Sequence, residues 1–324
     1  ELSDLVSKEL HVVVGYVGRN VVVGKPFTNM AAVIKAGSIT ATYQKQLLPF
    51  YDVFDEMRYF EAGSTTTVFE IKGQKVGIAI CEDLWNDKGA DNYHYDDNPL
   101  AQYRDLNVDV LLSLNSSPFV RSKVEERLDK VAQASIDGLT IVYVNQVGGQ
   151  DELVFDGGSF VAQGGQLTHF SDELFEDSYA IADLLDRKMV KAPAALTKNK
   201  RLTDLLILGL RDYVKKSGFS ELVLASSGGV DSAVVCKLAC DAVGPERVHA
   251  VRMPSVFSSQ HSRDDAMALH ENLGCWDYEV PVDHEELLAK LNRFYSIHES
   301  RINLVSRRLA EDNYSSVADE NIQA

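Results

Sequence analysis

The chain has 324 residues, more than one compact core usually fills, and this length favours two domains. Apolar residues make up 45% and charged residues 25% of the sequence, so the chain can bury its cores and is not expected to be disordered. The 32 basic residues against 48 acidic ones give a net charge of −16, which argues against binding to nucleic acid or to an anionic membrane surface.

Short runs of β-forming residues, separated by Gly, Asn and Asp, fill most of the first 185 residues. One stretch, 123–136, has helical periodicity instead. Many strands with few helices predict an α/β sandwich. The expected strands are 11–16, 29–34, 38–43, 66–71, 75–80, 108–114, 140–144 and 158–162.

The segment 186–200 is basic, contains Pro193 and is interpreted as a linker. A helix is expected at 202–216, and from there strands and helices alternate, which predicts a parallel sheet with right-handed crossovers. We therefore expect one domain at 1–185 and another at 201–324. The expected strands are 221–225, 247–252 and 278–282, and the expected helices between them are 232–243 and 260–273.

Four cysteines are too few and too scattered for a disulfide framework. No apolar run approaches the roughly 20 residues of a membrane-spanning helix. A reducing, cytoplasmic location is the expectation that follows.

A glycine-rich loop lies between an apolar strand and an amphipathic helix, where free backbone amides can bind phosphate. Its Asp231 would repel phosphate, so we expect it to hold a divalent cation, Mg²⁺. The alternative is a purely structural role for this loop, as a tight turn with a helix cap. The absence of Gly-Lys-Ser/Thr argues against a kinase or GTPase. The loop residues are Ser226, Ser227, Gly228, Gly229, Val230, Asp231 and Ser232.

Cys81 follows a buried strand and begins the sequence Cys-Glu-Asp-Leu-Trp. A lone Cys in this position is more often a small buried hydrophobe than a nucleophile. Four other stretches favour chemistry: 43–49 with Lys45, 51–60, 115–119 and 145–149.

Together these motifs resemble the glutamine-dependent NAD synthetases, in which a nitrilase-type glutaminase (carbon–nitrogen hydrolase) domain is fused to an ATP-pyrophosphatase-type synthetase domain. The resemblance spans nearly the whole chain. It implies an α-β-β-α sandwich followed by a doubly wound, Rossmann-like parallel sheet. It also implies a ligase that uses ammonia from glutamine and ATP to convert deamido-NAD into NAD, with AMP, pyrophosphate and glutamate as the other products.

The resemblance also implies roles for single residues. Cys81 would attack glutamine, and Lys45 would lower the thiol pKa and stabilise the oxyanion. Glutamine contacts would come from Tyr51, Ser117 and Lys123. ATP contacts would come from the loop 226–232 with Arg252 and Met253, and Asn321 would contact deamido-NAD.

The sequence departs from the family in one respect. The family's catalytic Glu lies upstream of its Lys, and no Glu among the 44 residues before Lys45 has that context. Both domains are also expected to be incomplete at their outer ends. Two rival functions are another ATP-pyrophosphatase amidotransferase and a nitrilase-family amidase with a degenerate nucleotide domain. A homo-oligomer is expected from the family.

Overall fold

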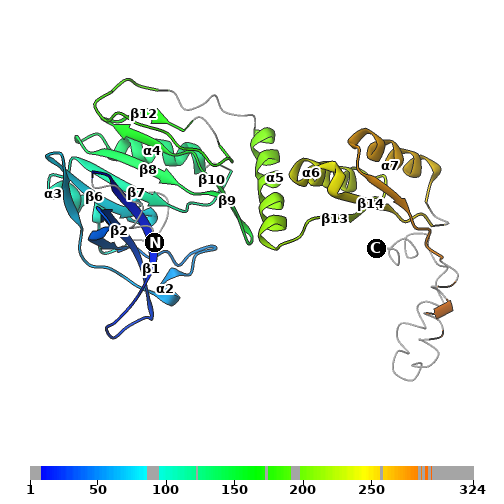
Figure 1. Ribbon diagram of the computed structural model, residues 1–324, viewed down its shortest axis with the longest axis horizontal. Coiled ribbons are helices and arrows are strands. Elements are labelled where there is room, and N and C mark those ends of the chain that lie inside the picture. Colours follow the sequence, from blue (N-terminus) through cyan, green and yellow to red (C-terminus); the bar gives the residue numbers. More distant parts are fainter. Residues whose placement is uncertain are drawn as a thin grey trace. The chain divides into compact units, whose positions relative to one another are not determined.

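The computed structural model describes residues 9–85, 95–121, 123–171, 174–190, 198–255 and 258–283, with positions 286, 289, 290 and 293. The chain divides into two compact units, and the border between Gly209 and Leu210 falls inside helix α5 (Lys198–Lys216) (Figure 1). This helix begins within the segment expected to be a linker. Its first turns are tied to the first unit, where Arg201 forms an ion pair with Glu125 at 2.7 Å.

The first unit contains two large sheets. Six strands follow the order β12-β11-β8-β7-β6-β5, and a smaller sheet has the order β1-β2-β3 with β4 beside β2. β9 (Val147–Gln150) and β10 (Leu153–Asp156) form a separate hairpin. The strands of the larger sheet are β5 (Val68–Ile71), β6 (Gln74–Ile80), β7 (Val110–Asn115), β8 (Thr140–Asn145), β11 (Phe160–Gln163) and β12 (Gln166–Phe170). The strands of the smaller sheet are β1 (His11–Arg19), β2 (Phe27–Lys35), β3 (Ser38–Gln44) and β4 (Phe60–Glu61).

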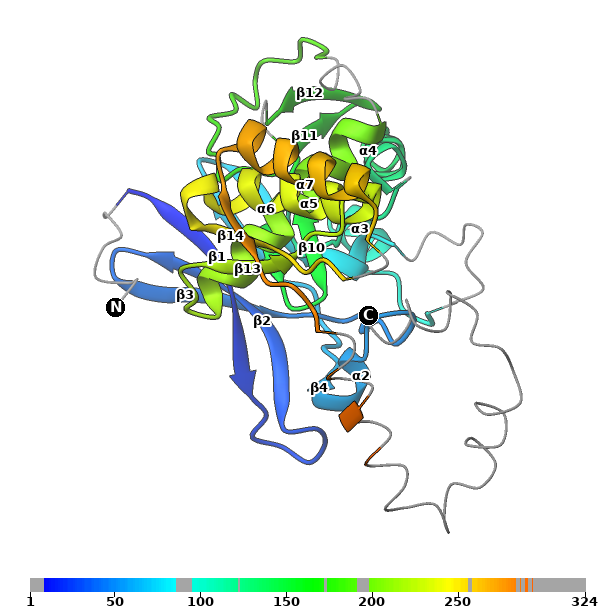
Figure 2. The ribbon, with the colours of Figure 1, turned by 90° about the vertical axis from the view of Figure 1, so that its right-hand side faces the viewer.

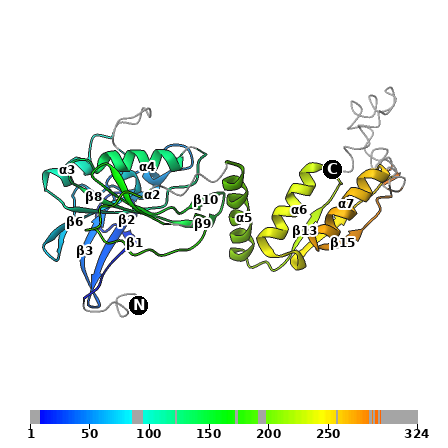
Figure 3. The ribbon, with the colours of Figure 1, turned by 90° about the horizontal axis from the view of Figure 1, so that it is seen from above.

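Two apolar clusters hold this unit together as layers. One joins β6, β7 and β8 to the helices α3 (Pro99–Asp105) and α4 (Lys123–Ala134). The other lies between the sheets and joins Ala31, Val33 and Tyr43 to Ile78 and Ile80 of β6. Figure 3 shows α3 and α4 on one side of the unit and β1–β3 on the other. The predicted nitrilase-like sandwich is confirmed, and among the described residues α3 and α4 cover one face of the larger sheet.

The eight strands expected in this half are all present, with ends shifted by up to three residues. Four further strands, β4, β9, β10 and β12, were not predicted. They have two to five residues each, and Gly149 and Gly148 interrupt the β-type pattern of one of them.

The second unit is built on the parallel sheet β13-β14-β15. Helices α6 and α7 lie side by side on one face of it (Figure 2), so the predicted alternation of strands and helices is confirmed. The third strand begins two residues earlier than expected. The elements are β13 (Leu222–Ala225), α6 (Val230–Val243), η2 (Pro245–Arg247), β14 (Val248–Arg252), α7 (Gln260–Leu273) and β15 (Trp276–Glu279).

Cys236 and Cys240 of α6 lie in the core of this unit with Val248 and Ala250. Cys275 adds a third thiol, 3.9 Å from the sulfur of Cys236. Burial and the neighbouring thiols raise the pKa of Cys236 to about 12 and that of Cys240 to about 11. The thiols of Cys236 and Cys240 therefore stay protonated near neutral pH and pack as small apolar groups. All four cysteines are free. No helix in the described part of the chain is long and apolar enough to cross a membrane.

Candidate active site and nucleotide cavity

A cavity of about 530 Å³ opens at the carboxyl ends of β6, β7 and β8 in the first unit. These strands are parallel neighbours, so the residues that follow them meet at one edge of the sheet. Cys81, Asn115 and Asn145 line the cavity from this edge, and Lys45 lines it from the end of β3. The structure therefore brings together two residues, Lys45 and Cys81, that the sequence could pair only by resemblance.

The backbone at Cys81 is left-handed, with φ at +46°, a conformation that is uncommon for a residue with a Cβ. The residue begins the short 3₁₀ helix η1 (Cys81–Leu84), and this sharp turn presents the thiol to the cavity. Strained backbone of this kind is concentrated at functional sites.

Lys45 is only 2% exposed, and its ammonium group contacts Glu56 at 2.7 Å. Glu56 begins helix α2 (Glu56–Tyr59) and also accepts a hydrogen bond from Asn29 at 3.3 Å. Burial alone would lower the pKa of Lys45, but its electrostatic interactions with Cys81 and Glu56 outweigh that effect and raise the pKa. Lys45 is therefore a charged donor held inside the cavity.

At the thiol of Cys81, burial is the largest influence on the pKa and is not outweighed by the nearby charges. Burial raises its pKa, Lys45 opposes that rise, and the carboxylates of Glu82 and Glu56 add to it. The pKa of Cys81 is raised overall, so its side chain is a neutral thiol near neutral pH. Lys45 acts in the expected direction and lowers the thiol pKa, but burial and the two carboxylates outweigh it.

Asp83 ties the two sides of the site together. It is 1% exposed and accepts hydrogen bonds from the amide of Ile80, next to Cys81, and from the amides of Gln46 and Leu47, which follow Lys45. The hydroxyl of Tyr43 donates to it as well. One buried carboxylate thus fixes the spacing of both functional side chains.

The three residues expected to hold glutamine lie close to the cavity without lining it. The hydroxyl of Tyr51 donates to Glu82 at 3.0 Å, and Lys123 lies over the ring of Phe54, which does line the cavity. Ser117 is buried, and its amide donates to the side chain of Asn145.

Reasoning from the sequence missed three carboxylates at this site: Glu56, Glu82 and Asp83. Glu56 lies in the stretch 51–60 that carries the family resemblance, and the other two directly follow Cys81. A search for acidic residues inside those motifs could have found them. Their contacts with Lys45, Tyr51 and Ile80 could not be inferred from sequence spacing alone.

A second cavity of about 360 Å³ lies in the second unit, at the carboxyl ends of β13 and β14. Five residues expected to bind ATP line it: Ser226, Ser227, Ser232, Arg252 and Met253. Gly228, Gly229, Val230 and Asp231 belong to the same loop but are not among the lining residues. Asn321 lies outside the described residues.

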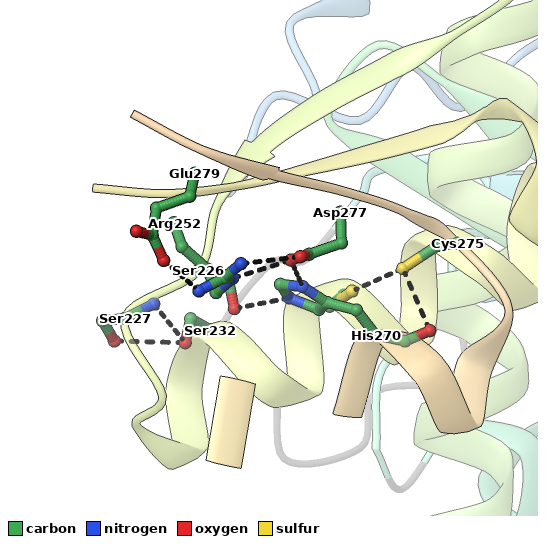
Figure 4. Close-up of polar contacts among 9 residues, drawn as sticks. Ser226, Ser227, Ser232, Arg252, His270, Cys275, Asp277 and Glu279 are labelled. Atoms are coloured by element: carbon green, nitrogen blue, oxygen red, sulfur yellow. Dashed lines mark hydrogen bonds and ion pairs between the residues drawn. The ribbon is translucent and has the colours of Figure 1, made fainter. Parts of the chain in front are cut away.

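Hydrogen bonds within the loop give it a fixed shape. The Ser232 hydroxyl accepts from the amide of Ser227 at 3.2 Å, and the Ser227 hydroxyl accepts from the amide of Gly229 (Figure 4). Gly228 has φ at +82°, and a Cβ at this position would collide with the backbone oxygen of Ser262. Only glycine fits there, which supports the expectation of a loop built for close backbone approach.

The fold and the two cavities define a protein with a nitrilase-type sandwich that carries a Cys and Lys, and a nucleotide-binding type of parallel sheet. The sequence profile of the carbon–nitrogen hydrolase family matches residues 4–183, and that of NAD synthase matches residues 202–324. The chain therefore belongs to the carbon–nitrogen hydrolase family, and its resemblance to glutamine-dependent NAD synthetases is confirmed in both halves.

Curated relatives support the same conclusion. The glutamine-dependent NAD(+) synthetase of Synechocystis sp. is 39% identical over 80% of this chain and 48% of its own length. The synthetase of Aquifex aeolicus is 34% identical over 94% of this chain and 57% of its own length. The chain thus spans about half the length of the curated relatives it matches.

Among solved structures, the glutamine-dependent NAD+ synthetase of Acinetobacter baumannii in complex with ADP matches the whole chain. The TM-score is 0.84, the identity is 35%, and the match covers 57% of that structure. A synthetase from Cytophaga hutchinsonii, at 20% identity and a TM-score of 0.69, agrees in fold over 90% of this chain.

Proposed function

We propose that the protein is a glutamine-hydrolysing NAD synthetase, a ligase that amidates deamido-NAD with ammonia taken from glutamine. The products are NAD, AMP, pyrophosphate and glutamate. The observation that carries this proposal is the combination, in one chain, of a Cys81–Lys45 cavity and a phosphate-type loop. Relatives named glutamine-dependent NAD(+) synthetases match across both halves.

In the first cavity, the sulfur of Cys81 attacks the amide carbon of glutamine. Ammonia leaves with a proton returned by the group that took it from the thiol, and water then hydrolyses the thioester to glutamate. The thiol first loses its proton, and the carboxylates lining the cavity, Glu56 and Glu82, are the groups able to accept it. The buried ammonium group of Lys45 stabilises the oxyanion that forms during attack. Tyr51, Ser117 and Lys123 are proposed to orient glutamine through the wall of the cavity.

In the second cavity, the loop 226–232 with Arg252 and Met253 is proposed to bind ATP. Asp231 is exposed in the first turn of α6, beside Ser232. A single carboxylate beside a phosphate site suits Mg²⁺, which is commonly held by one or two carboxylates together with phosphate oxygens. Such an ion would neutralise the charge of the leaving pyrophosphate. Asn321 is proposed to contact deamido-NAD, and a cytoplasmic homo-oligomer is the proposed setting.

The proposal is tested by comparing two nitrogen sources. With glutamine, ATP and deamido-NAD, Cys81→Ala should abolish NAD formation, whereas added ammonium should restore it. Asp231→Ala should impair both reactions, because adenylation precedes amination. Normal turnover of Cys81→Ala with glutamine would exclude Cys81 as the nucleophile, and glutamine hydrolysis without any ATP-dependent product would favour the amidase alternative. Amidation of another acid would favour a different ATP-pyrophosphatase amidotransferase.

A further inference from the structure

A chain of hydrogen bonds joins the phosphate loop to α7, β14 and β15 beside the second cavity (Figure 4). His270 of α7 is 1% exposed. Its Nε2 lies 2.9 Å from the hydroxyl of Ser226, the first residue of the phosphate loop. Its Nδ1 lies 2.6 Å from the carboxylate of Asp277 in β15. The contact between His270 and Ser226 connects residues that are 44 positions apart in sequence.

The same carboxylate also holds the opposite wall of the cavity. Arg252 donates two hydrogen bonds to Asp277, from Nε at 2.8 Å and from Nη2 at 2.7 Å. Ser226 and Arg252 both line the cavity. His270 and Asp277 do not line it, so they act on any ligand only through these two residues.

We propose that His270 is a positioning residue of the nucleotide cavity, which sets the direction of the Ser226 hydroxyl toward a nucleotide phosphate and braces Arg252 through Asp277. This inference rests on the proposed nucleotide site and extends it to residues that none of the motifs identified in the sequence includes.

The hydrogen bond between His270 and Ser226 can run in either direction, depending on whether the imidazole is neutral or protonated. Hydrogen bonds from Arg252, with a smaller contribution from His270, lower the pKa of Asp277 to about 2, so this carboxylate only accepts. Nδ1 of His270 therefore carries a proton. When the imidazole is neutral, Nε2 accepts the Ser226 hydrogen, and the serine turns only lone pairs toward the cavity.

When the imidazole is protonated, Nε2 donates to Ser226 instead. The serine hydrogen is then free to donate to a phosphate oxygen, and the imidazolium adds positive charge nearby. Nucleotide binding should therefore favour the protonated form, and affinity should rise as pH falls. Among the described residues, the imidazole of His270 contacts Ser226 of the loop and Asp277 of β15, and Arg252 of β14 is linked to it through Asp277. The thiol of Cys275, just before β15, contacts the backbone carbonyl of His270, and Cys236 of α6 lies beside that thiol.

The experiment measures ADP binding by calorimetry at about pH 6 and about pH 8, the range over which imidazoles titrate. His270→Gln removes the imidazole but keeps a polar side chain, and circular dichroism verifies that the variant is folded. We expect His270→Gln to weaken ADP binding about 10-fold at the lower pH and clearly less at the higher pH. Taking the ratio of variant to wild type cancels protonation of ADP itself.

His261→Gln is the matched control, because His261 lies on the same helix, is 84% exposed and pairs with Asp265. It should leave ADP binding unchanged at both pH values. Ser226→Ala should weaken binding and remove most of the further effect of His270→Gln, because both act through one hydroxyl.

Equal loss at both pH values, or additive losses in the double variant, would overturn the positioning role and leave the nucleotide site intact. A folded wild type that binds no ADP would instead refute the nucleotide site itself, and the inference with it.

Discussion

Replacing Glu56 with glutamine should make Cys81 more reactive toward a small neutral alkylating agent. The amide oxygen of the new side chain can still accept the hydrogen bond that Lys45 now donates to Glu56 at 2.7 Å, so Lys45 stays in place. The variant loses one negative charge, and that charge raises the pKa of Cys81. The full ammonium charge of Lys45 then acts on the sulfur.

The size of the effect follows from the geometry. Glu56 and Cys81 line one cavity together with Lys45, and Glu56 is 21% exposed. A negative charge in the same cavity commonly raises a thiol pKa by about one unit. One unit is about 1.4 kcal/mol and a ~10-fold change in thiolate fraction below the pKa. Lys45→Met should act in the opposite direction and slow alkylation by at least ~10-fold.

The assay is the rate of iodoacetamide modification of Cys81, followed by mass spectrometry across a pH series. The wild-type midpoint should lie above the ordinary thiol range, because burial raises the pKa of Cys81. It should move down in Glu56→Gln and up in Lys45→Met. Glu70→Gln, an exposed carboxylate of β5 outside the cavity, serves as the control. If Glu56→Gln slows alkylation as much as Lys45→Met does, then Glu56 acts by positioning Lys45, and the charge argument is wrong.

Three further predictions address the two units separately. Gly228→Ala should weaken ADP binding by at least ~10-fold, because the new Cβ collides with the Ser262 backbone. The control is Gly218→Ala, at a position that is also left-handed but lies in open space, and it should leave binding unchanged. Equal effects of the two variants in calorimetry would contradict the steric account. Arg127→Met breaks the buried ion pair with Asp156 and should lower the free energy of unfolding by about 3–5 kcal/mol. Glu126→Gln, in the exposed pair with Lys130, should lower it by about 0.5 kcal/mol or less. Similar unfolding curves for the two variants would show that the buried pair is unimportant. Asp83→Ala should slow modification of Cys81 by a glutamine analogue more than by iodoacetamide, because it loosens the spacing of Cys81 and Lys45; an equal slowing would refute its positioning role.

Much of the fold could be predicted because its signals are local. The alternation of apolar strands with helices that end at Gly244 and Gly274 identified the parallel sheet of the second unit. Apolar runs bounded by turn residues identified the long strands of the first. Strand β9 was missed because Gly148 and Gly149 interrupt its β-type pattern. The pairing of the two sheets could not be predicted because it depends on contacts between distant residues.

The candidate sites show the same division. Cys81, Lys45 and the phosphate loop could be found because each belongs to a motif. Glu56 and Asp83 lie in or beside those motifs, but their contacts with Lys45 and Ile80 form only when the chain folds. The contact of His270 with Ser226 spans 44 residues and no motif, so only the three-dimensional structure reveals it.

The central claim is that Cys81 is a nucleophile for the amide of glutamine, and covalent capture tests it most directly. The protein is incubated with a chloroketone analogue of glutamine, digested and analysed by mass spectrometry, with and without excess glutamine. The account predicts one adduct on the peptide that contains Cys81, protection by glutamine, and a much slower reaction in Lys45→Met. Modification spread over Cys236, Cys240 and Cys275, or labelling of Cys81 that glutamine does not slow, would contradict the account.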